Sequence, residues 1–209
     1  MALDESLLEA APELGGPVLR FYGWTEPAAT FGYSQRFADV EKLTPLRPLI
    51  RRPTGGGVVP HDRDWTYTLV FPPNHWWYRL RARESYEQLH VWLQRAFERL
   101  GVPTELAPTT AAGPPTHCFV RWEQFDVLWR GAKIAGAAQR RTKSGLLIQG
   151  SVQPPAGCER TAWEREVCAL ATEGWQAVWE QWTPDSGRLA HATELARRKY
   201  ALDSYNRRR

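Results

Sequence analysis

Short strand-like segments occur in runs along this chain, and amphipathic segments separate the runs. Most of the strand-like segments are bounded by Gly or Pro, which interrupt regular structure. They cover residues 17–21, 29–33, 49–52, 65–71, 125–129, 133–138 and 146–152. Runs of strands with helices between the runs indicate an α+β fold with a mixed or antiparallel sheet packed against helices.

The clearest helix is predicted for residues 85–100, with Ser85 as the N-cap and Gly101 as the stop. Its apolar face consists of Tyr86, Leu89, Leu93, Phe97 and Leu100. Further helices are predicted for residues 2–10, 160–182 and 185–200. A chain of 209 residues fits one domain, so we expect residues 1–209 to form a single catalytic-type domain.

The composition is that of a globular protein, with 43% hydrophobic and 24% charged residues. No segment approaches the ~18 consecutive apolar residues of a membrane span, and the acidic N-terminus does not resemble a signal peptide. We expect a cytoplasmic protein that binds no membrane. Three cysteines, Cys118, Cys158 and Cys168, form no CxxC metal site and suit a reducing compartment. The net charge of +4 favours an acidic partner, either nucleic acid or protein.

A glycine-rich loop follows the predicted strand at residues 49–52. Three consecutive glycines, Gly55, Gly56 and Gly57, permit positive φ and close approach of backbone N–H groups to a ligand. The preceding Arg51 and Arg52 could neutralise a phosphate or polarise a carbonyl. A glycine-rich turn with surface arginines is an equally good reading, because the segment is neither a P-loop nor a dinucleotide motif.

A lysine and a cysteine lie in settings that suit acyl chemistry. Lys133 is surrounded by small residues in a predicted strand, where a partly desolvated ammonium could polarise a thioester or lower the pKa of a thiol. Cys118 ends a proline-rich loop and is a candidate nucleophile. His117 is not assigned as its base, since neighbours on an extended chain point in opposite directions. A snorkelling lysine and a small buried cysteine are the alternatives.

Taken together, the ordered motifs of the chain resemble the biotin/lipoate protein ligase superfamily, which includes lipoate ligases and octanoyltransferases. The motifs are residues 1–8, 19–24, 32–35, 51–56, 61–62, 66–67, Lys133, Gly136, Gln139 and 199–206. The resemblance implies the fold of these enzymes. It also implies acyl- or carbonyl-binding roles for Arg52, Thr54, Gly55, Gly56, Gly57, His61, Gly136 and Gln149.

Residues 61–67 and Cys118 look more like the octanoyltransferases than like the ATP-dependent ligases. The resemblance implies ping-pong transfer of an octanoyl or lipoyl group from acyl carrier protein to a lysine of a lipoyl-domain acceptor of the glycine cleavage H protein type. Cys118 would be the nucleophile, Lys133 would favour its thiolate, and residues 55–57 would donate to the carbonyl oxygen. No cofactor and no metal would be required. Arg51, Arg52 and Arg140 could meet the carrier's phosphopantetheine or acidic surface.

The chain departs from the family where Gln149-Gly150-Ser151 replaces His-Gly-Ser, because glutamine cannot titrate. Two alternatives therefore stay open. One is an ATP- and Mg²⁺-dependent lipoate ligase, and the other is a non-catalytic acyl- or carrier-binding protein. A nucleic-acid partner, as in the repressor-type biotin ligases, is not expected, since no helix-turn-helix segment precedes the domain in this sequence.

Overall fold

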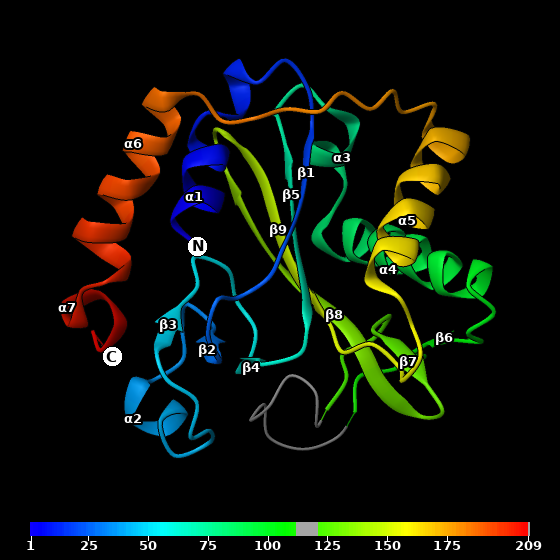
Figure 1. The fold of residues 1–209 in the computed structure, drawn as a ribbon, viewed down its shortest axis with the longest axis horizontal. Helices are drawn as coiled ribbons and strands as arrows, with labels where there is room; N and C mark the ends of the chain where they lie inside the picture. Colours follow the sequence, from blue (N-terminus) through cyan, green and yellow to red (C-terminus); the bar gives the residue numbers. More distant parts are fainter. Residues whose placement is uncertain (112–120, 209) are drawn as a thin grey trace.

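A computed structural model describes residues 1–111 and 121–208. Two β-sheets form its frame (Figure 1). The larger sheet has the strand order β1-β5-β9-β8-β7-β6, and every neighbouring pair in it is antiparallel. Its strands are β1 (Val18–Tyr22), β5 (Trp65–Phe71), β6 (Glu105–Leu106), β7 (Val127–Trp129), β8 (Ala132–Thr142) and β9 (Gly145–Val152).

The smaller sheet has the order β3-β2-β4. Strand β2 (Ala28–Phe31) pairs in parallel with β3 (Leu49–Arg51) and antiparallel with β4 (Val59–His61). One sheet is thus antiparallel and the other mixed, which confirms the predicted α+β class. Short strands β4 and β6 were not predicted from the sequence.

Helices cover both faces of the large sheet (Figure 1). Helices α4 and α5 pack on one face, and α1 contacts β5 and β9 from the other. The helices are α1 (Ala2–Glu9), η1 (Ala11–Glu13), α2 (Phe37–Val40), α3 (Trp76–Arg79), α4 (Ala82–Arg99), α5 (Arg160–Trp175), α6 (Ser186–Leu195), the π-helical η2 (Ala196–Tyr200) and α7 (Asp203–Asn206). Within the described residues, none is both long and apolar enough to cross a membrane.

Alternation along the central strands divides their side chains between the two faces. In β9, Leu146 and Ile148 belong to the main core under α4 and α5, whereas Leu147 packs against α1. Gln149 and Ser151 continue the row of Leu147, so the polar end of that row lies on the α1 side of the sheet. The functional site is built on this face.

Two helix boundaries differ from the sequence-based predictions. Helix α4 starts one turn earlier than expected, because the Glu84 carboxylate accepts the N–H of Arg81 at 2.7 Å. Ser85 lies inside the helix and is not the N-cap. Helix α5 ends at Trp175, because Gln176 adopts the left-handed conformation with φ of 55°, so the helix predicted to reach residue 182 was too long.

Candidate functional site

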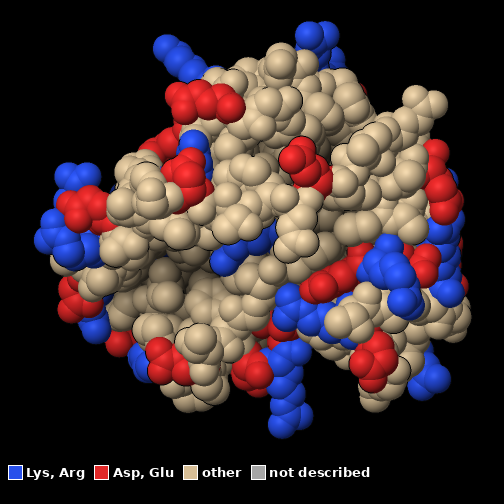
Figure 2. Space-filling view, turned by 45° about the horizontal axis from the view of Figure 1, so that its top comes forward, with Lys and Arg blue, Asp and Glu red and all other residues tan. Residues whose placement is uncertain are grey.

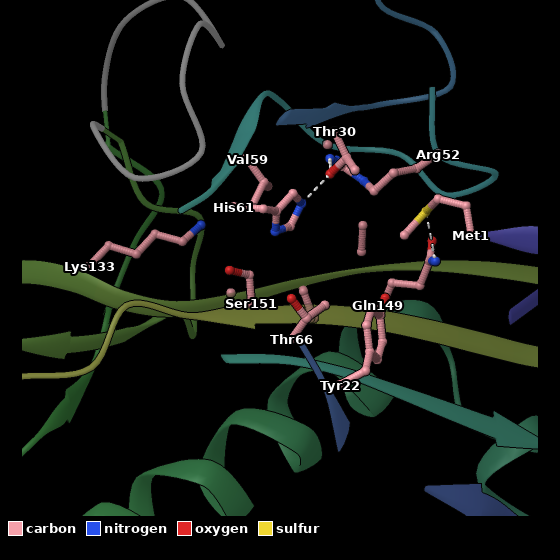
Figure 3. A pocket seen from close by; sticks show the side chains of 15 residues that line it. Met1, Tyr22, Thr30, Arg52, Val59, His61, Thr66, Lys133, Gln149 and Ser151 are labelled. Carbon is pink, nitrogen blue, oxygen red and sulfur yellow. Dashed lines mark hydrogen bonds between the residues drawn. The ribbon is translucent and has the colours of Figure 1, made fainter. Parts of the chain in front are cut away.

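A hollow lies between the two sheets (Figure 3). The space between its walls is about 460 Å³ when solvent at its open mouth is included, and the cavity volume that water-sized molecules can occupy is about 40 Å³. One wall comes from the small sheet and the other from β5, β8 and β9 of the large sheet. The lining residues are Met1, Tyr22, Thr30, Arg52, Gly56, Val59, His61, Thr66, Lys133, Gly136, Ala137, Ala138, Gln149, Gly150 and Ser151.

Strand register selects which residues of the large sheet reach this cavity. Gly136 pairs with Ser151 and Ala138 pairs with Gln149, so these four residues share one face. Small residues on β8 therefore stand beside hydrogen-bonding residues on β9. This combination leaves space above the sheet and keeps a few polar groups at its edge.

The β7–β8 hairpin delivers Lys133 to the cavity. Its two-residue turn has positive φ at Arg130 (51°) and Gly131 (74°), the combination of a type I′ turn. The register of the β7–β8 pair shifts between Val127 and Leu128, so the regular alternation of side chains between the two faces is interrupted there. Lys133 consequently folds over Gly136, where an added Cβ would lie 2.6 Å from the lysine Nζ. Because Gly136 has no side chain, the Lys133 side chain can occupy the space above it.

A buried carboxylate fixes the Lys133 ammonium. Asp126 Oδ2 lies 2.7 Å from Lys133 Nζ, and both side chains are almost fully buried. Tyr86 donates its hydroxyl to Asp126 Oδ1 at 2.5 Å, and the Glu123 N–H donates to Oδ2 at 2.6 Å. The ammonium therefore has a defined direction toward the cavity (Figure 3). The Asp126 carboxylate partly neutralises the positive charge of this ammonium.

Arg52 ties the glycine-rich loop to the small sheet. It donates to Thr30 Oγ1 at 2.9 Å and to the carbonyl oxygens of Gly55 and Gly57 at 2.8 and 2.9 Å. Only Gly56 of the three glycines lines the cavity, and its φ is +87°. The loop also packs on Gly32, where an added Cβ would overlap the Gly56 carbonyl. A side chain at Gly32 would displace the loop, and a side chain at Gly56 would be strained by the positive φ there.

The prediction that Arg51 meets a carrier or phosphate is wrong. Its side chain is fully buried and donates to the carbonyl oxygens of Tyr33 and Gln35 at 2.7 Å each. It also donates to the carbonyl oxygens of Tyr205 and Asn206 at 3.2 and 2.8 Å. Adjacent residues of a strand point in opposite directions, so Arg52 reaches the cavity while Arg51 anchors the C-terminal segment.

His61 is the centre of a buried hydrogen-bond network. Its Nδ1 lies 2.8 Å from Asp64 Oδ2, and its Nε2 lies 2.7 Å from Thr30 Oγ1. The Trp24 ring stacks on the imidazole with 4.1 Å between centroids. Burial lowers the pKa of His61, and Asp64 opposes this effect by raising it. Trp24 thus supports the histidine and does not line the cavity.

Gln149 is held between the cavity and α1. It accepts the Thr54 hydroxyl at 2.8 Å and donates to Asp4 Oδ2 at 2.7 Å. Both of these contacts are buried. Gln149 therefore acts in the structure as a hydrogen-bonding link between the glycine-loop residue Thr54 and helix α1.

The structure brings together six of the predicted site residues, which line the cavity: Arg52, Gly56, His61, Lys133, Gly136 and Gln149. Thr54 lies behind it, and the carbonyls of Gly55 and Gly57 are bound by Arg52. Cys118 and His117 lie outside the described residues. Burial raises the pKa of both other thiols, and Glu164 adds to the effect at Cys168, which makes these cysteines poor nucleophiles.

Sequence reasoning missed the residues that hold the cavity groups in place. Asp126 and Asp64 are both buried beneath their cationic or imidazole partners. Ser151 and Thr30 line the cavity itself. Two signals in the sequence could have identified the aspartates. Asp126 lies at the start of a predicted strand, and Asp64 lies three residues after the candidate His61. Among the described residues, no group of His, Cys, Asp and Glu side chains is arranged to hold a metal ion.

Residues 1–153 match the family model of the lipoyl protein ligase A/B catalytic domain. This span contains Cys118 and every residue that lines the cavity. The chain belongs to this family. As a member of the lipoyl protein ligase A/B catalytic domain family, it uses the family's fold for the walls of the site.

Curated relatives of this lipoyl protein ligase A/B chain include octanoyltransferase LipM of Oceanobacillus iheyensis, 34% identical over 159 residues. LipM of Carboxydothermus hydrogenoformans is 35% identical over 160 residues. Each match covers 73% of this chain, but only 58% and 59% of the relatives. The chain thus aligns with less than two thirds of these proteins.

Solved structures share the fold. The bi-partite lipoate protein ligase of Thermoplasma acidophilum superposes with a TM-score of 0.74 at 19% identity, covering 99% of this chain and 89% of that one. A lipoate-protein ligase A bound with ATP superposes with a TM-score of 0.80 at 18% identity, covering 99% and 92%. At these identities the likeness establishes the lipoate-ligase fold of the chain.

Proposed function

We propose that the chain is an acyltransferase that moves an octanoyl group from acyl carrier protein, through a Cys118 thioester, to a lysine of a lipoyl-domain acceptor. The observation that carries the proposal is the 34–35% identity to enzymes named octanoyltransferase LipM. The archaeal ligase that shares the fold was solved together with an E2 lipoyl domain, and we extend that type of acceptor to this chain. A lipoyl group is the second acyl substrate.

The cavity supplies what acyl transfer requires from a protein. The Lys133 ammonium faces the cavity from one end, and Arg52 closes the other (Figure 3). A positive group beside a thioester carbonyl stabilises the oxyanion that forms when a nucleophile attacks. Val59, Ala137 and Ala138 add carbon surface to the walls. At about 0.8 kcal/mol per buried methylene, an eight-carbon tail contributes several kcal/mol to selection of chain length.

In the proposed first step, the Cys118 thiolate attacks the carrier thioester and releases the phosphopantetheine thiol. In the second step, the acceptor amine attacks the Cys118 thioester and forms the amide. Lys133 favours the thiolate, as the resemblance implies, and no ATP, cofactor or metal takes part. Arg140 donates to the Pro53 carbonyl at 3.2 Å beside the glycine loop, and this contact supports the proposal that Arg140 meets an anionic carrier.

On the face shown in Figure 2, charge favours no single patch as the carrier-docking surface. In Figure 2 the Lys and Arg side chains alternate with Asp and Glu over the visible face and form no continuous basic region.

The test is intact-protein mass spectrometry after mixing the protein with octanoyl-acyl carrier protein in the absence of ATP. A mass gain of one octanoyl group is expected for the wild type and for Cys168→Ala, but not for Cys118→Ala. Addition of a lipoyl domain should then discharge the adduct. Modification of the lipoyl domain only with ATP and free lipoate would contradict the proposal in favour of a ligase. Acyl binding without any transfer would contradict it in favour of a binding protein.

A further inference from the structure

Aminolysis of a thioester needs a base. When the amine nitrogen bonds to the carbonyl carbon, it becomes positively charged and must lose a proton before the amide is stable. Gln149 cannot titrate, and Lys133 donates to Asp126. Arg52 stays protonated at all ordinary pH values, and burial raises the pKa of Tyr22 well above its usual value. His61 carries the one imidazole among the described residues that line the cavity.

The hydrogen bonds of His61 define a proton path. A carboxylate can only accept, so Nδ1 donates to Asp64 and Nε2 keeps its lone pair. Thr30 Oγ1 accepts from Arg52, which can only donate, and its own proton therefore points to Nε2 at 2.7 Å. The path runs from the Thr30 hydroxyl, which lines the cavity, through His61 to Asp64.

Asp64 is held so that it can balance a positive charge on His61. Its Oδ2 accepts three hydrogen bonds, from His61, from Ser151 at 2.6 Å and from Thr66 at 3.0 Å. Its Oδ1 is buried and has no hydrogen-bond partner within the described part of the chain. A carboxylate with spare acceptor capacity, fixed against one ring nitrogen, orients an imidazole and stabilises the imidazolium that forms.

The charges around His61 favour its neutral form at rest. Burial is the largest effect and lowers its pKa, while the hydrogen bond and charge of Asp64 raise it. Arg52 and the N-terminal ammonium lower it further. Lys133 faces the same cavity from β8. A neutral histidine is able to accept a proton, and Asp64 makes the protonated state accessible during turnover.

We propose that His61, acting through the Thr30 hydroxyl, accepts the proton of the attacking amine. This inference rests on the proposed function. As the C–N bond forms, the nitrogen gives a proton to Thr30 Oγ1, which passes its own proton to His61 Nε2. The C–S bond then breaks with its electron pair on sulfur, and the imidazolium returns the proton to the thiolate. The net products are an amide and a thiol.

The two half-reactions test this assignment separately. The wild type, His61→Gln and Thr30→Val are first loaded from octanoyl-acyl carrier protein, and transfer to a lipoyl domain is then followed in a single turnover. Thiolate attack needs no base, so the loading rate shows how far each substitution disturbs the cavity, and the ratio of the transfer rate to the loading rate isolates the proton transfer. Transfer should fall about 100- to 1,000-fold in both variants, the usual contribution of a general base. His191→Gln, changed at a half-exposed histidine, is the control.

The pH dependence separates proton transfer from a structural role. For the wild type, the logarithm of the transfer rate should rise with a slope of about 2 below the pKa of His61, and of about 1 above it, where only the acceptor amine titrates. His61→Gln should show a slope of about 1 throughout. Imidazole added to His61→Ala should restore part of the rate.

Variants that load and transfer within threefold of the wild type, with the steeper acid limb unchanged, would overturn the role of His61 alone. Thr30→Val keeps the shape of the residue, so it decides the question even where the His61 variants do not fold. Wild-type protein that never loads would remove the proposed function itself, and this inference with it.

Discussion

Replacing Arg51 by lysine tests whether Arg51 stabilises the fold or binds a ligand. The guanidinium donates to four backbone carbonyls, two on the β2 side and two in the C-terminal segment. Lysine keeps the charge but concentrates its donors on one nitrogen. An ammonium placed near Tyr33 and Gln35 leaves the carbonyls of Tyr205 and Asn206 without that donor.

The expected loss follows from those two carbonyls. A buried acceptor left without a donor costs about 1–3 kcal/mol, so Arg51→Lys should lower the free energy of unfolding by about 2–6 kcal/mol. Urea unfolding followed by tryptophan fluorescence measures this quantity. Arg197→Lys, at an exposed site paired with Glu194, should stay within about 0.5 kcal/mol of the wild type.

A loss below about 1 kcal/mol for Arg51→Lys would refute this reasoning. It would mean that the C-terminal carbonyls find other donors, and that the arginine contributes little to holding the segment. A normal free energy of unfolding combined with weakened use of the acyl carrier protein would instead restore the ligand-binding reading of Arg51.

Three further substitutions follow from the packing. Gly136→Ala places a Cβ 2.5 Å from Lys133 Cε, so acyl loading should fall at least tenfold with little change in melting temperature, as single-turnover loading and a thermal melt would show. Gly32→Ala meets the Gly56 carbonyl and should cost about 1–3 kcal/mol in urea unfolding. Burial lowers the pKa of His90 from 6.5 to about 4, so the native state resists its protonation. Stability should be full above pH 6.5 and fall toward pH 4 by roughly 3 kcal/mol, and His90→Phe should remove this slope in pH-dependent melts.

Local patterns were sufficient to predict the central elements of the fold. The alternation in residues 65–71 identified β5 with the bounds that the structure shows, and the strand-like segments 125–129 and 133–138 identified the two strands of the hairpin that carries Lys133. Both features depend only on neighbours in sequence, since side-chain period and turn dihedrals are local properties.

The supporting residues could not be predicted because they depend on contacts between distant segments. Asp126 meets Lys133 through a register shift in the hairpin, which no pattern in the sequence marks. Arg51 is buried and Arg52 lines the cavity because the C-terminal segment covers one face of β3. Sequence thus located the cavity residues and left open which of two adjacent arginines faces a ligand.

The anchoring of the C-terminal segment by Arg51 also sets an order of events during synthesis. Arg51 and Tyr205 are 154 residues apart in the chain. At about 5–20 residues per second, that interval takes about 8–30 s to translate. Throughout it, the strand next to the glycine-rich loop has emerged but its arginine has no C-terminal carbonyls to bind. The Arg51 guanidinium therefore lacks two of its four carbonyl acceptors until the end of synthesis, and a ribosome that stalls between residues 153 and 205 leaves a product that contains every strand of the large sheet but not this anchor.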